Sequence, residues 1–392
     1  MKITKPVLLL LSLTLLACKS KTDTDIRLEK SELQLTGLRT RAMQANNIPR
    51  SIDNNGKTRW IETPYDWTEG FWPGTCWMLY EQTRDEQWKE AAVASQKIFK
   101  QHKNLTNDHD LGFIFNNSYG KAYRITNNNE YKQVLIDAAN SLITRFNKTV
   151  GCIQSWDVVG NWQATRGWKF PVIIDNMMNL ELLFEVSNIT GDSIYKDIAI
   201  THANTTMRNH FRPDGSSYHV LDYNPQTGEV VSKVTAQGYA DESAWSRGQS
   251  WGLYAYTMCY RYTKDKKYLD FAEKIASFIL NHPNYPEDGV PYWDFNAPNI
   301  PNEPRDVSSA AILASALIEL SNYTHNKYLK NAEHILNSLS TDAYNAQPGE
   351  NGNFVLMHSV GSLPHGNEIN VPLNYADYYY IEALIRLKNK KI

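Results

Sequence analysis

The chain has 392 residues, of which 42% are apolar and 21% charged, and its formal net charge is −2. This composition fits a globular protein of one or two domains and gives no reason to expect nucleic acid or a polybasic membrane surface as a partner. The 11 Trp and 23 Tyr are more informative. Aromatic rings line grooves that stack against sugars, so their number points to a carbohydrate ligand.

The N-terminus has the features of a targeting segment. Two lysines precede the apolar stretch VLLLLSLTLLA, which is too short to span a bilayer and has signal-peptide proportions. It ends in Leu-Leu-Ala-Cys18, which resembles a bacterial lipobox; the alternative is an ordinary signal peptide followed by a chance cysteine. We expect a lipoprotein signal peptide over residues 1–18, lipidation (palmitate) at Cys18 and a polar tether over residues 19–27. The mature protein would then be anchored in the periplasm or on the outer-membrane surface.

Three further cysteines, Cys76, Cys152 and Cys259, are spaced too widely for a disulfide framework or a zinc site. We expect buried free thiols. The ten histidines show no metal-binding spacing, and the chain has no Gly-rich loop of the kind that cradles phosphate. The spacing of these residues therefore indicates neither a metal site nor a phosphate-binding loop.

A short motif recurs five times along the chain. Segments such as DEQWKEAA and DSIYKDIA place an aromatic residue just after a polar turn and a small or apolar residue four positions later. Each segment opens a stretch with apolar residues at i, i+3, i+4 and i+7, which is the pattern of an amphipathic helix. The aromatic residues are Trp88, Tyr131, Tyr195, Tyr268 and Tyr328.

Between these helices lie others that are apolar on several sides, such as NMMNLELLFEVSN and VSSAAILASALIELSNY. With one helix near residues 29–46, about twelve helices alternate between the two kinds. Six helical hairpins closed into an all-α (α/α)6 barrel fit this alternation, as a single domain over residues 28–392; an open α-solenoid is the alternative. The one plausible β-hairpin, within residues 216–234, would be a loop excursion.

The segments that precede the apolar helices are long and rich in polar and aromatic residues, for example NLTNDHDLGF and SWDVVGNWQATRGWKFPVIID. In a ring of hairpins all inner helices run the same way, so these segments gather at one rim. Loops on a rigid scaffold are where binding and catalytic residues concentrate. The pattern therefore predicts a ligand site or an active site at this rim.

Asp110 in NDHDLGFIF and Asp175 in VIIDNMMNL both stand just before an apolar helix. Either could simply cap its helix, because Asp is a preferred N-cap residue. Together on one rim, near several loop tryptophans, they form the carboxylate pair in an aromatic cleft that glycosidases use. The apolar neighbours of Asp175 would raise its pKa and keep it protonated as an acid. Asp110 has the polar neighbours Asp108 and His109, among which it would stay ionised.

The segment SRGQSWGLY places Arg247 and Trp251 one helical turn apart. A guanidinium fork and a stacking ring on one face suit a carboxylate on a sugar ring. The alternative is a buried Arg247 paired with Asp241 or Glu242. The excursion just upstream could close the site with His219, Thr235 and Gln237.

Six motifs, in order along nearly all of the mature chain, resemble the unsaturated glucuronyl hydrolases of glycoside hydrolase family 88. They are WTEGFWPG, HDLGF, VIIDNMMNLELLF, SRGQSWGLYAY, DVSSAAI and YADYYYIEALIRL. The resemblance implies an (α/α)6 barrel. It also implies an enzyme that acts downstream of a polysaccharide lyase, removing the Δ4,5-unsaturated uronic acid that the lyase leaves at the non-reducing end of an oligosaccharide.

The reaction implied by the resemblance is hydration of the C4=C5 vinyl ether, after which the hemiketal opens and releases the sugar. Asp175 would be the general acid that protonates C4 and then the base for water attack at C5, and Asp110 would orient the ring. No metal or organic cofactor is implied. The substrate-binding residues expected from the resemblance are Trp67, His109, His219, Thr235, Gln237, Arg247 and Trp251.

The chain departs from the family pattern near its C-terminus. Some members recognise sulfated substrates through a cluster that contains Ser and Lys, whereas HSVGSLPHGNEINVP here contains His365, Asn367 and Glu368.

Two other functions are alternatives to an unsaturated glucuronyl hydrolase. One is an unsaturated rhamnogalacturonyl hydrolase of the family 105 type, and the other is a non-catalytic, sugar-binding surface lipoprotein. Two aspartates before inner helices favour an enzyme, because binding alone needs no acid beside an apolar wall.

Overall fold

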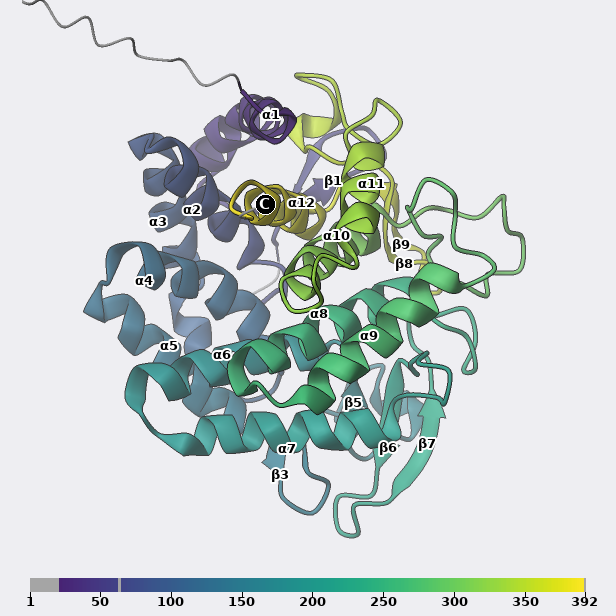
Figure 1. Cartoon of the computed structure of the whole chain (residues 1–392). Coiled ribbons are helices and arrows are strands. Elements are labelled where there is room, and N and C mark those ends of the chain that lie inside the picture. The colour runs from purple at the N-terminus through teal and green to yellow at the C-terminus, as the bar shows by residue number, and fades with distance from the viewer. Residues whose placement is uncertain (1–20, 63–64, 391–392) are drawn as a thin grey trace, which may run out of the picture.

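The structure, a computed structural model, describes residues 21–62 and 65–390. Its helices form two concentric layers (Figure 1). The inner layer consists of α2 (Phe71–Thr83), the π-helix η2 (Gly112–Gly120) continued by α4 (Lys121–Thr126), α6 (Asn176–Thr190), α8 (Ser246–Thr263), α10 (Val307–Ser321) and α12 (Asn374–Lys388). The outer layer consists of α1 (Asp23–Ala45), α3 (Glu86–Ile98), α5 (Asn129–Ile143), α7 (Ser193–Asn209), α9 (Lys266–Asn281) and α11 (Leu329–Leu339).

The inner layer closes into a ring, because its last helix, α12, packs against its first, α2. This contact confirms the predicted (α/α)6 barrel and rules out an open solenoid. The inner helices are buried on nearly every side, with every residue of α10 in the core. The thiols of Cys76, Cys152 and Cys259 are also buried, and none of them forms a disulfide within the described residues, as expected.

Four of the five recurring aromatic residues join an outer helix to the outer helix before it. The rings of these four are buried, and the polar group of each donates a hydrogen bond to the preceding outer helix. These bonds join Trp88 to Glu32, Tyr195 to Asn140, Tyr268 to Asn204 and Tyr328 to Glu273, at 2.7–3.0 Å. The sequence repeat thus corresponds to a repeated contact around the outer layer.

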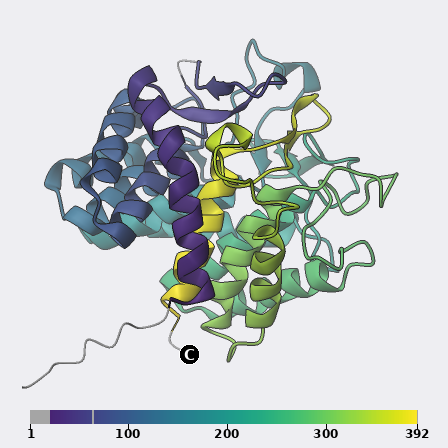
Figure 2. The same cartoon turned by 90° about the horizontal axis from the view of Figure 1, so that it is seen from above.

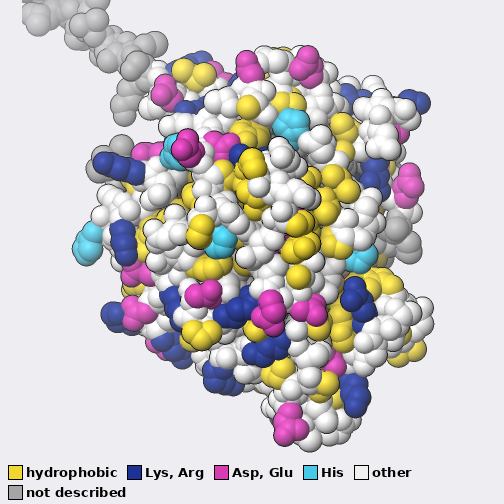
Figure 3. Space-filling model, turned by 90° about the vertical axis from the view of Figure 1, so that its right-hand side faces the viewer, with side chains coloured by type: hydrophobic (Ala, Val, Ile, Leu, Met, Phe, Trp, Pro, Cys, Tyr) yellow, Lys and Arg dark blue, Asp and Glu magenta, His cyan; other side chains and the backbone are white. Residues whose placement is uncertain are grey.

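Short strands and long loops gather at one end of the barrel, away from the C-terminus (Figure 2). The strands are β1 (Pro49–Ile52), β2 (Thr58–Trp60), β3 (Phe146–Asn147), β4 (Cys152–Ile153), β5 (Pro171–Ile173), β6 (Val220–Tyr223), β7 (Val230–Val234), β8 (Ser359–Ser362) and β9 (Asn367–Val371). The hairpin predicted within residues 216–234 is β6–β7, and β5 joins it to form a three-stranded antiparallel sheet. On the face that carries β8 and β9, acidic and basic side chains are interspersed (Figure 3).

Helix α1 begins inside the segment that we expected to be a tether, residues 19–27. The Thr22 hydroxyl accepts a hydrogen bond from the backbone of Asp25, and the Asp25 carboxylate accepts one from the backbone of Thr22. This capping box starts the helix at Asp23. Cys18 and the predicted signal peptide lie outside the described residues. Within residues 21–62 and 65–390, no helix is long and apolar enough to cross a membrane.

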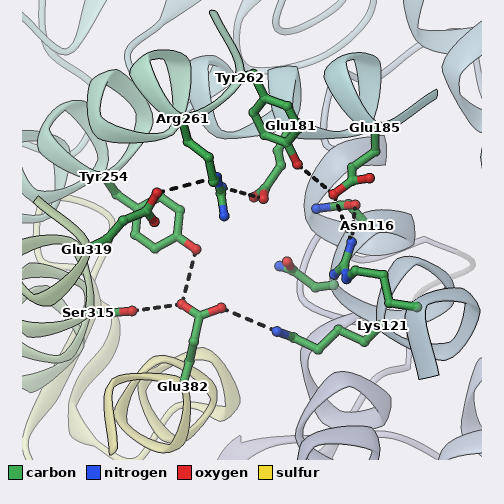
Figure 4. Close-up of polar contacts among 12 residues, drawn as sticks. Asn116, Lys121, Glu181, Glu185, Tyr254, Arg261, Tyr262, Ser315, Glu319 and Glu382 are labelled. Carbon is green, nitrogen blue, oxygen red and sulfur yellow. Dashed lines mark hydrogen bonds and ion pairs between the residues drawn. The ribbon is translucent and has the colours of Figure 1, made fainter. Parts of the chain in front are cut away.

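The C-terminal ends of the inner helices are joined by buried ion pairs around a cavity of about 250 Å³ (Figure 4). Glu382 of α12 accepts hydrogen bonds from three neighbouring helices, and Arg261 of α8 lies 2.6 Å from Glu181 of α6. The donors to Glu382 are Lys121 at 3.3 Å, Tyr254 at 3.1 Å and Ser315 at 2.8 Å. Because cations and carboxylates alternate, the charges compensate each other and hold the helices together at this end of the barrel.

Candidate active site

Asp175 lies between β5 and α6 and does not cap its helix. Its side chain makes no hydrogen bond to the first turn of α6, whereas the aspartate or asparagine before each of α3, α5, α7 and α9 does cap. The Asp175 side chain is buried, with the residue 8% exposed, and its Oδ2 has no hydrogen-bond partner among the described residues. Burial raises the pKa of Asp175 to about 6, against the opposing charge of Arg247. The carboxyl group is therefore available for proton transfer, and the cap interpretation is wrong for this residue.

His219 reaches Asp175 through a strand pairing. In the antiparallel pair of β5 and β6, Ile173 lies opposite Val220, so the residues that flank the pair meet at one end. Nδ1 of His219 accepts hydrogen bonds from the backbone N–H groups of Ala236 at 3.0 Å and Gln237 at 3.1 Å. In a neutral ring the hydrogen must then lie on Nε2, which is 3.7 Å from Asp175 Oδ2.

His219 stays neutral in this position, since burial lowers its pKa well below 6.5 and the charge of Arg247 adds to that effect. The ring therefore offers one N–H group toward the Asp175 carboxylate and takes no proton from it. This arrangement stabilises Asp175 in its ionised form, the form that follows proton donation.

Asp110 stands two residues before the π-helix η2, on the same rim. Its Oδ1 accepts a hydrogen bond from Asn179 Nδ2 at 3.3 Å, and Asn179 Oδ1 in turn accepts the N–H of Phe113 at 2.9 Å. Burial and the negative charges of Asp108 and Asp175 raise the pKa of Asp110 well above its ordinary value. The prediction that Asp110 would stay ionised among polar neighbours is wrong, because the charges that act most strongly on it are the carboxylates of Asp108 and Asp175, which raise its pKa.

Arg247 is buried at the start of α8, but neither predicted partner, Asp241 or Glu242, is the one it binds. Its Nη1 donates to Asp306 Oδ2 at 2.9 Å, and its Nη2 donates to Gln237 Oε1 at 2.9 Å. The same nitrogens also donate to the carbonyls of Val360 and Gly361 in β8. The guanidinium therefore joins β8, α10 and the loop of Gln237, and only Nε lacks a partner within the described residues.

The two tryptophans expected to contact substrate occupy different places. Trp251 is fully buried: Phe113 lies 5.0 Å and Tyr379 lies 5.3 Å from it between ring centroids, so its ring is covered and offers no stacking platform. Its indole N–H lies close enough to Asp175 to lower the pKa of that carboxyl, although no hydrogen bond of normal geometry forms. Trp67 is only partly buried and packs against Phe113 and Tyr375, at the entrance to α2.

Thr235 and His109 hold their neighbours in place. The Thr235 hydroxyl accepts the N–H of Gly238 at 2.8 Å, which shapes the loop that carries Gln237. His109 is buried behind Asp110, with Nε2 at 3.5 Å from Asp110 Oδ1, and burial lowers its pKa to about 3. Both residues lie at the rim as predicted, and both contact protein groups that carry the site.

A cluster of aromatic rings lines the rim beside His219. Trp156 lies 6.2 Å from the His219 ring and stacks on Trp168 at 5.9 Å. Trp162, which is 42% exposed, packs at 5.4 Å from Trp156 and at 5.2 Å from His365 of the β8–β9 hairpin. We call Trp156, Trp162, Trp168 and His365 the aromatic wall.

Two residues of the site, Asn179 and Asp306, were not among those predicted from the sequence. Asn179 follows Asp175 by four positions, so helical spacing alone would have placed it on the same face of α6. Asp306 begins the motif DVSSAAI, directly before an apolar helix, but its pairing with Arg247 could not be predicted, because the two residues lie 59 positions apart in the chain. Its other oxygen caps α10 through Ser308.

Asp108, His109 and Asp110 offer three candidate metal-ligand atoms within 4.8 Å of one another. The carboxylates of both aspartates are already engaged, by the N–H of Asp110 and by the Asn179 amide. Burial also raises the pKa of both carboxyl groups, which opposes the deprotonation that a metal requires. The chemistry of this group therefore fits proton sharing better than cation binding.

The chain matches the family model described as Glycosyl Hydrolase Family 88 over residues 37–391. It is 45% identical to an unsaturated glucuronyl hydrolase from Formosa agariphila, over 98% of both chains. It is 33% identical to an unsaturated chondroitin disaccharide hydrolase from Streptococcus agalactiae, over 87% of this chain and 83% of the relative.

The fold is likewise similar to solved structures. An unsaturated glucuronyl hydrolase specific for heparin superposes with a TM-score of 0.87 at 48% identity, over 93% of this chain and 96% of that one. The unsaturated glucuronyl hydrolase from Bacillus sp. GL1 superposes with a TM-score of 0.86 at 30% identity, over 93% of this chain and 97% of that one. These matches favour family 88 over the family 105 type and an enzyme over a non-catalytic sugar-binding protein. The chain belongs to glycosyl hydrolase family 88 and is a glycoside hydrolase.

Proposed function

We propose that this enzyme removes the Δ4,5-unsaturated uronic acid from the non-reducing end of oligosaccharides that a polysaccharide lyase has produced. The observation that carries the proposal is the buried Asp175 carboxyl, which caps no helix, has its pKa raised to about 6 and faces the neutral N–H of His219. A carboxyl group of this kind can hold a proton near neutral pH and transfer it to carbon.

The reaction begins with proton transfer from Asp175 to C4 of the C4=C5 double bond. Positive charge then develops at C5 and the ring oxygen, and water adds at C5 while the ionised Asp175 accepts its proton. The product is a hemiketal that opens and releases the remaining sugar, so one water is consumed and Asp175 regains its proton. The His219 N–H and the charge of Arg247 stabilise the ionised carboxylate between the two proton transfers.

Asp110 orients the unsaturated ring in this scheme. Burial and the charges of Asp108 and Asp175 raise the pKa of Asp110, which favours the protonated form. That form can donate a hydrogen bond to a ring hydroxyl while the Asn179 amide donates to Oδ1. Arg247 acts from behind the site by fixing Gln237, whose amide nitrogen remains available for the substrate.

The aromatic wall supports a second sugar beyond the unsaturated one. An exposed Trp162 ring held against His365 and Trp156 is suited to stacking on a pyranose face. Glu368 lies in the region where some family members recognise sulfate. Its carboxylate is buried, with Oε1 2.6 Å from Nε of Arg50, so it does not face the aromatic wall as a free charge.

A disaccharide from a glycosaminoglycan is the favoured substrate, and a heparin-type one is favoured over a chondroitin-type one. The heparin-specific relative is 48% identical to this chain, whereas the chondroitin disaccharide hydrolase of Streptococcus agalactiae is 33% identical.

The proposed location of the enzyme rests on the sequence. A lipobox at Cys18 would anchor the enzyme to a membrane, in the periplasm or on the outer-membrane surface.

The test uses a panel of lyase-generated disaccharides from heparin and chondroitin, sulfated and unsulfated, and follows loss of the ultraviolet absorbance of the C4=C5 bond. We expect loss of absorbance with heparin-type disaccharides, and release of the second sugar with it. Unchanged absorbance with every member of the panel would contradict the proposed function. Metabolic labelling with palmitate in a bacterial host, comparing the full chain with Cys18→Ala, tests the anchor.

A further inference from the structure

Asp108 lies beside Asp110 but has no part in the reaction scheme above. Its Oδ1 accepts a hydrogen bond from the backbone N–H of Asp110 at 3.0 Å, and the two carboxyl groups have oxygens within 4.8 Å of each other. The backbone of Asp108 is itself held by a β-bridge to Trp156. These contacts hold the Asp108 side chain and backbone at the position beside Asp110.

The two carboxyl groups have unequal surroundings. Asp108 receives hydrogen bonds from the Tyr65 hydroxyl and the Asp110 N–H, and it lies near the buried cation of Arg145. Asp110 receives one from the Asn179 amide and faces the negative charges of Asp108 and Asp175. Negative charge is therefore better stabilised on Asp108, and a proton shared between the two resides on Asp110.

Other titratable groups around the pair do not reverse this order. His109 is neutral, because burial lowers its pKa to about 3. The remaining charge near the site comes from Glu69, which acts on Tyr65, and from Arg247, which acts on Asp175. The charges that act most strongly on Asp110 are those of Asp108 and Asp175.

We propose that Asp108 is a positioning residue whose carboxylate keeps the proton on Asp110, so that Asp110 meets the substrate as a neutral hydrogen-bond donor. This inference rests on the function proposed above. Without Asp108, Asp110 ionises at lower pH and repels the uronate carboxylate of the substrate.

The experiment measures substrate affinity against pH in a background that does not turn over. Asp175→Asn prevents proton transfer, so the dissociation constant of an unsaturated disaccharide can be followed by calorimetry from pH 5 to pH 9. We expect affinity to fall as Asp110 ionises. In Asp108→Asn/Asp175→Asn the fall should begin at a pH lower by about one unit or more, as expected when a neighbouring negative charge is removed.

The matched control is Asp157→Asn/Asp175→Asn. Asp157 binds the same Arg145 at 2.9 Å, but its side chain is half exposed and it does not contact Asp110. This control should keep the pH dependence of Asp175→Asn, and Asp108→Glu/Asp175→Asn should restore it in part. Circular dichroism of each variant checks folding.

An unchanged pH dependence in the Asp108→Asn variant would overturn the inference, as would an affinity lowered equally at every pH, which is what a merely structural role produces. Failure of the proposed function looks different: Asp175→Asn would bind no unsaturated disaccharide, and the unmodified enzyme would leave the ultraviolet absorbance unchanged.

Discussion

His219 Nε2 lies 3.7 Å from Asp175 Oδ2, and the two atoms face each other without a direct hydrogen bond. The position of the hydrogen on His219 follows from the two backbone N–H groups that occupy Nδ1. His219 therefore acts only as a donor, and Asp175 is the group that can both give and take a proton. Because the tautomer of His219 is fixed by these backbone contacts, both proton transfers are left to Asp175.

Asp175→Asn should abolish turnover while leaving the fold intact. Removal of a general acid and base typically costs about 10²–10⁴-fold in rate, and here one residue serves both steps. The measurement is loss of C4=C5 absorbance with a heparin-type disaccharide. Asp270→Asn, which removes an exposed carboxylate from the outer helix α9, is the control and should keep full activity. An Asp175→Asn enzyme with full activity would show that the acid is a different residue.

The same substitution should stabilise the protein at neutral and alkaline pH. The pKa of Asp175 is raised from 3.8 to about 6, so the folded state binds its proton more tightly than the unfolded chain does. That stabilising contribution is complete below pH 3.8 and is lost as pH rises through 6. Since a pKa unit corresponds to about 1.4 kcal/mol, Asp175→Asn should gain about 3 kcal/mol over the natural enzyme at pH 8.

The stability measurement is urea unfolding at pH 5 and pH 8. The advantage of Asp175→Asn should be clearly smaller at pH 5, where the natural carboxyl is mostly protonated. An advantage of equal size at both pH values would indicate that packing, and not the buried charge, is responsible.

The pH dependence of kcat/KM should report the protonation of Asp175. The acid form is needed to protonate C4, so kcat/KM should fall as pH rises above about 6. Initial rates at low substrate concentration from pH 4.5 to pH 8.5 provide the profile. A kcat/KM that stays constant up to pH 8 would be inconsistent with Asp175 as the acid of the free enzyme.

Glu382→Gln should destabilise the protein without changing the chemistry of the rim. The substitution leaves Lys121 without its carboxylate in a buried network (Figure 4), and breaking a buried ion pair costs about 3–5 kcal/mol. It also removes one of the two carboxylates that pair with Arg386, which keeps Glu319. Thermal unfolding measures the loss, and kcat at a temperature well below the transition should stay within about twofold of the natural enzyme. Removing the exposed pair of Lys266 by Asp270→Asn should cost less than about 1 kcal/mol.

The effect of Glu382→Gln should also depend on pH. The neighbouring cations lower the pKa of Glu382 to about 2, below its ordinary value of 4.5, so its contribution is present above pH 4.5 and is lost as pH falls toward 2. The difference in stability between the two proteins should therefore shrink between pH 4.5 and pH 2. A constant difference across this range would show that the carboxylate charge is not what stabilises this end of the barrel.

The helical architecture could be predicted from the sequence because its signals are local. The recurring aromatic residue and the spacing of apolar residues identify the two kinds of helix, and their alternation identifies the barrel. The same logic located Asp175 and Asp110 at one rim, since parallel inner helices bring their N-terminal segments together. The start of α1 was misplaced because the capping box of Thr22 and Asp25 lies in a segment with no apolar period.

The chemistry of the site depended on contacts between distant parts of the chain. Before the fold was known, Asp175 could be a cap or an acid; the structure shows its side chain free of the helix and facing His219, which the pairing of β5 with β6 brings from 44 positions away. Likewise, Asp110 takes its charge state from Asp175 as well as from its own neighbour Asp108, and Arg247 takes its partner from α10. The apolar period of a helix depends on residues that are neighbours in the sequence. A pKa depends on the charges that lie within a few ångströms of the group, and only the tertiary structure decides which charges these are.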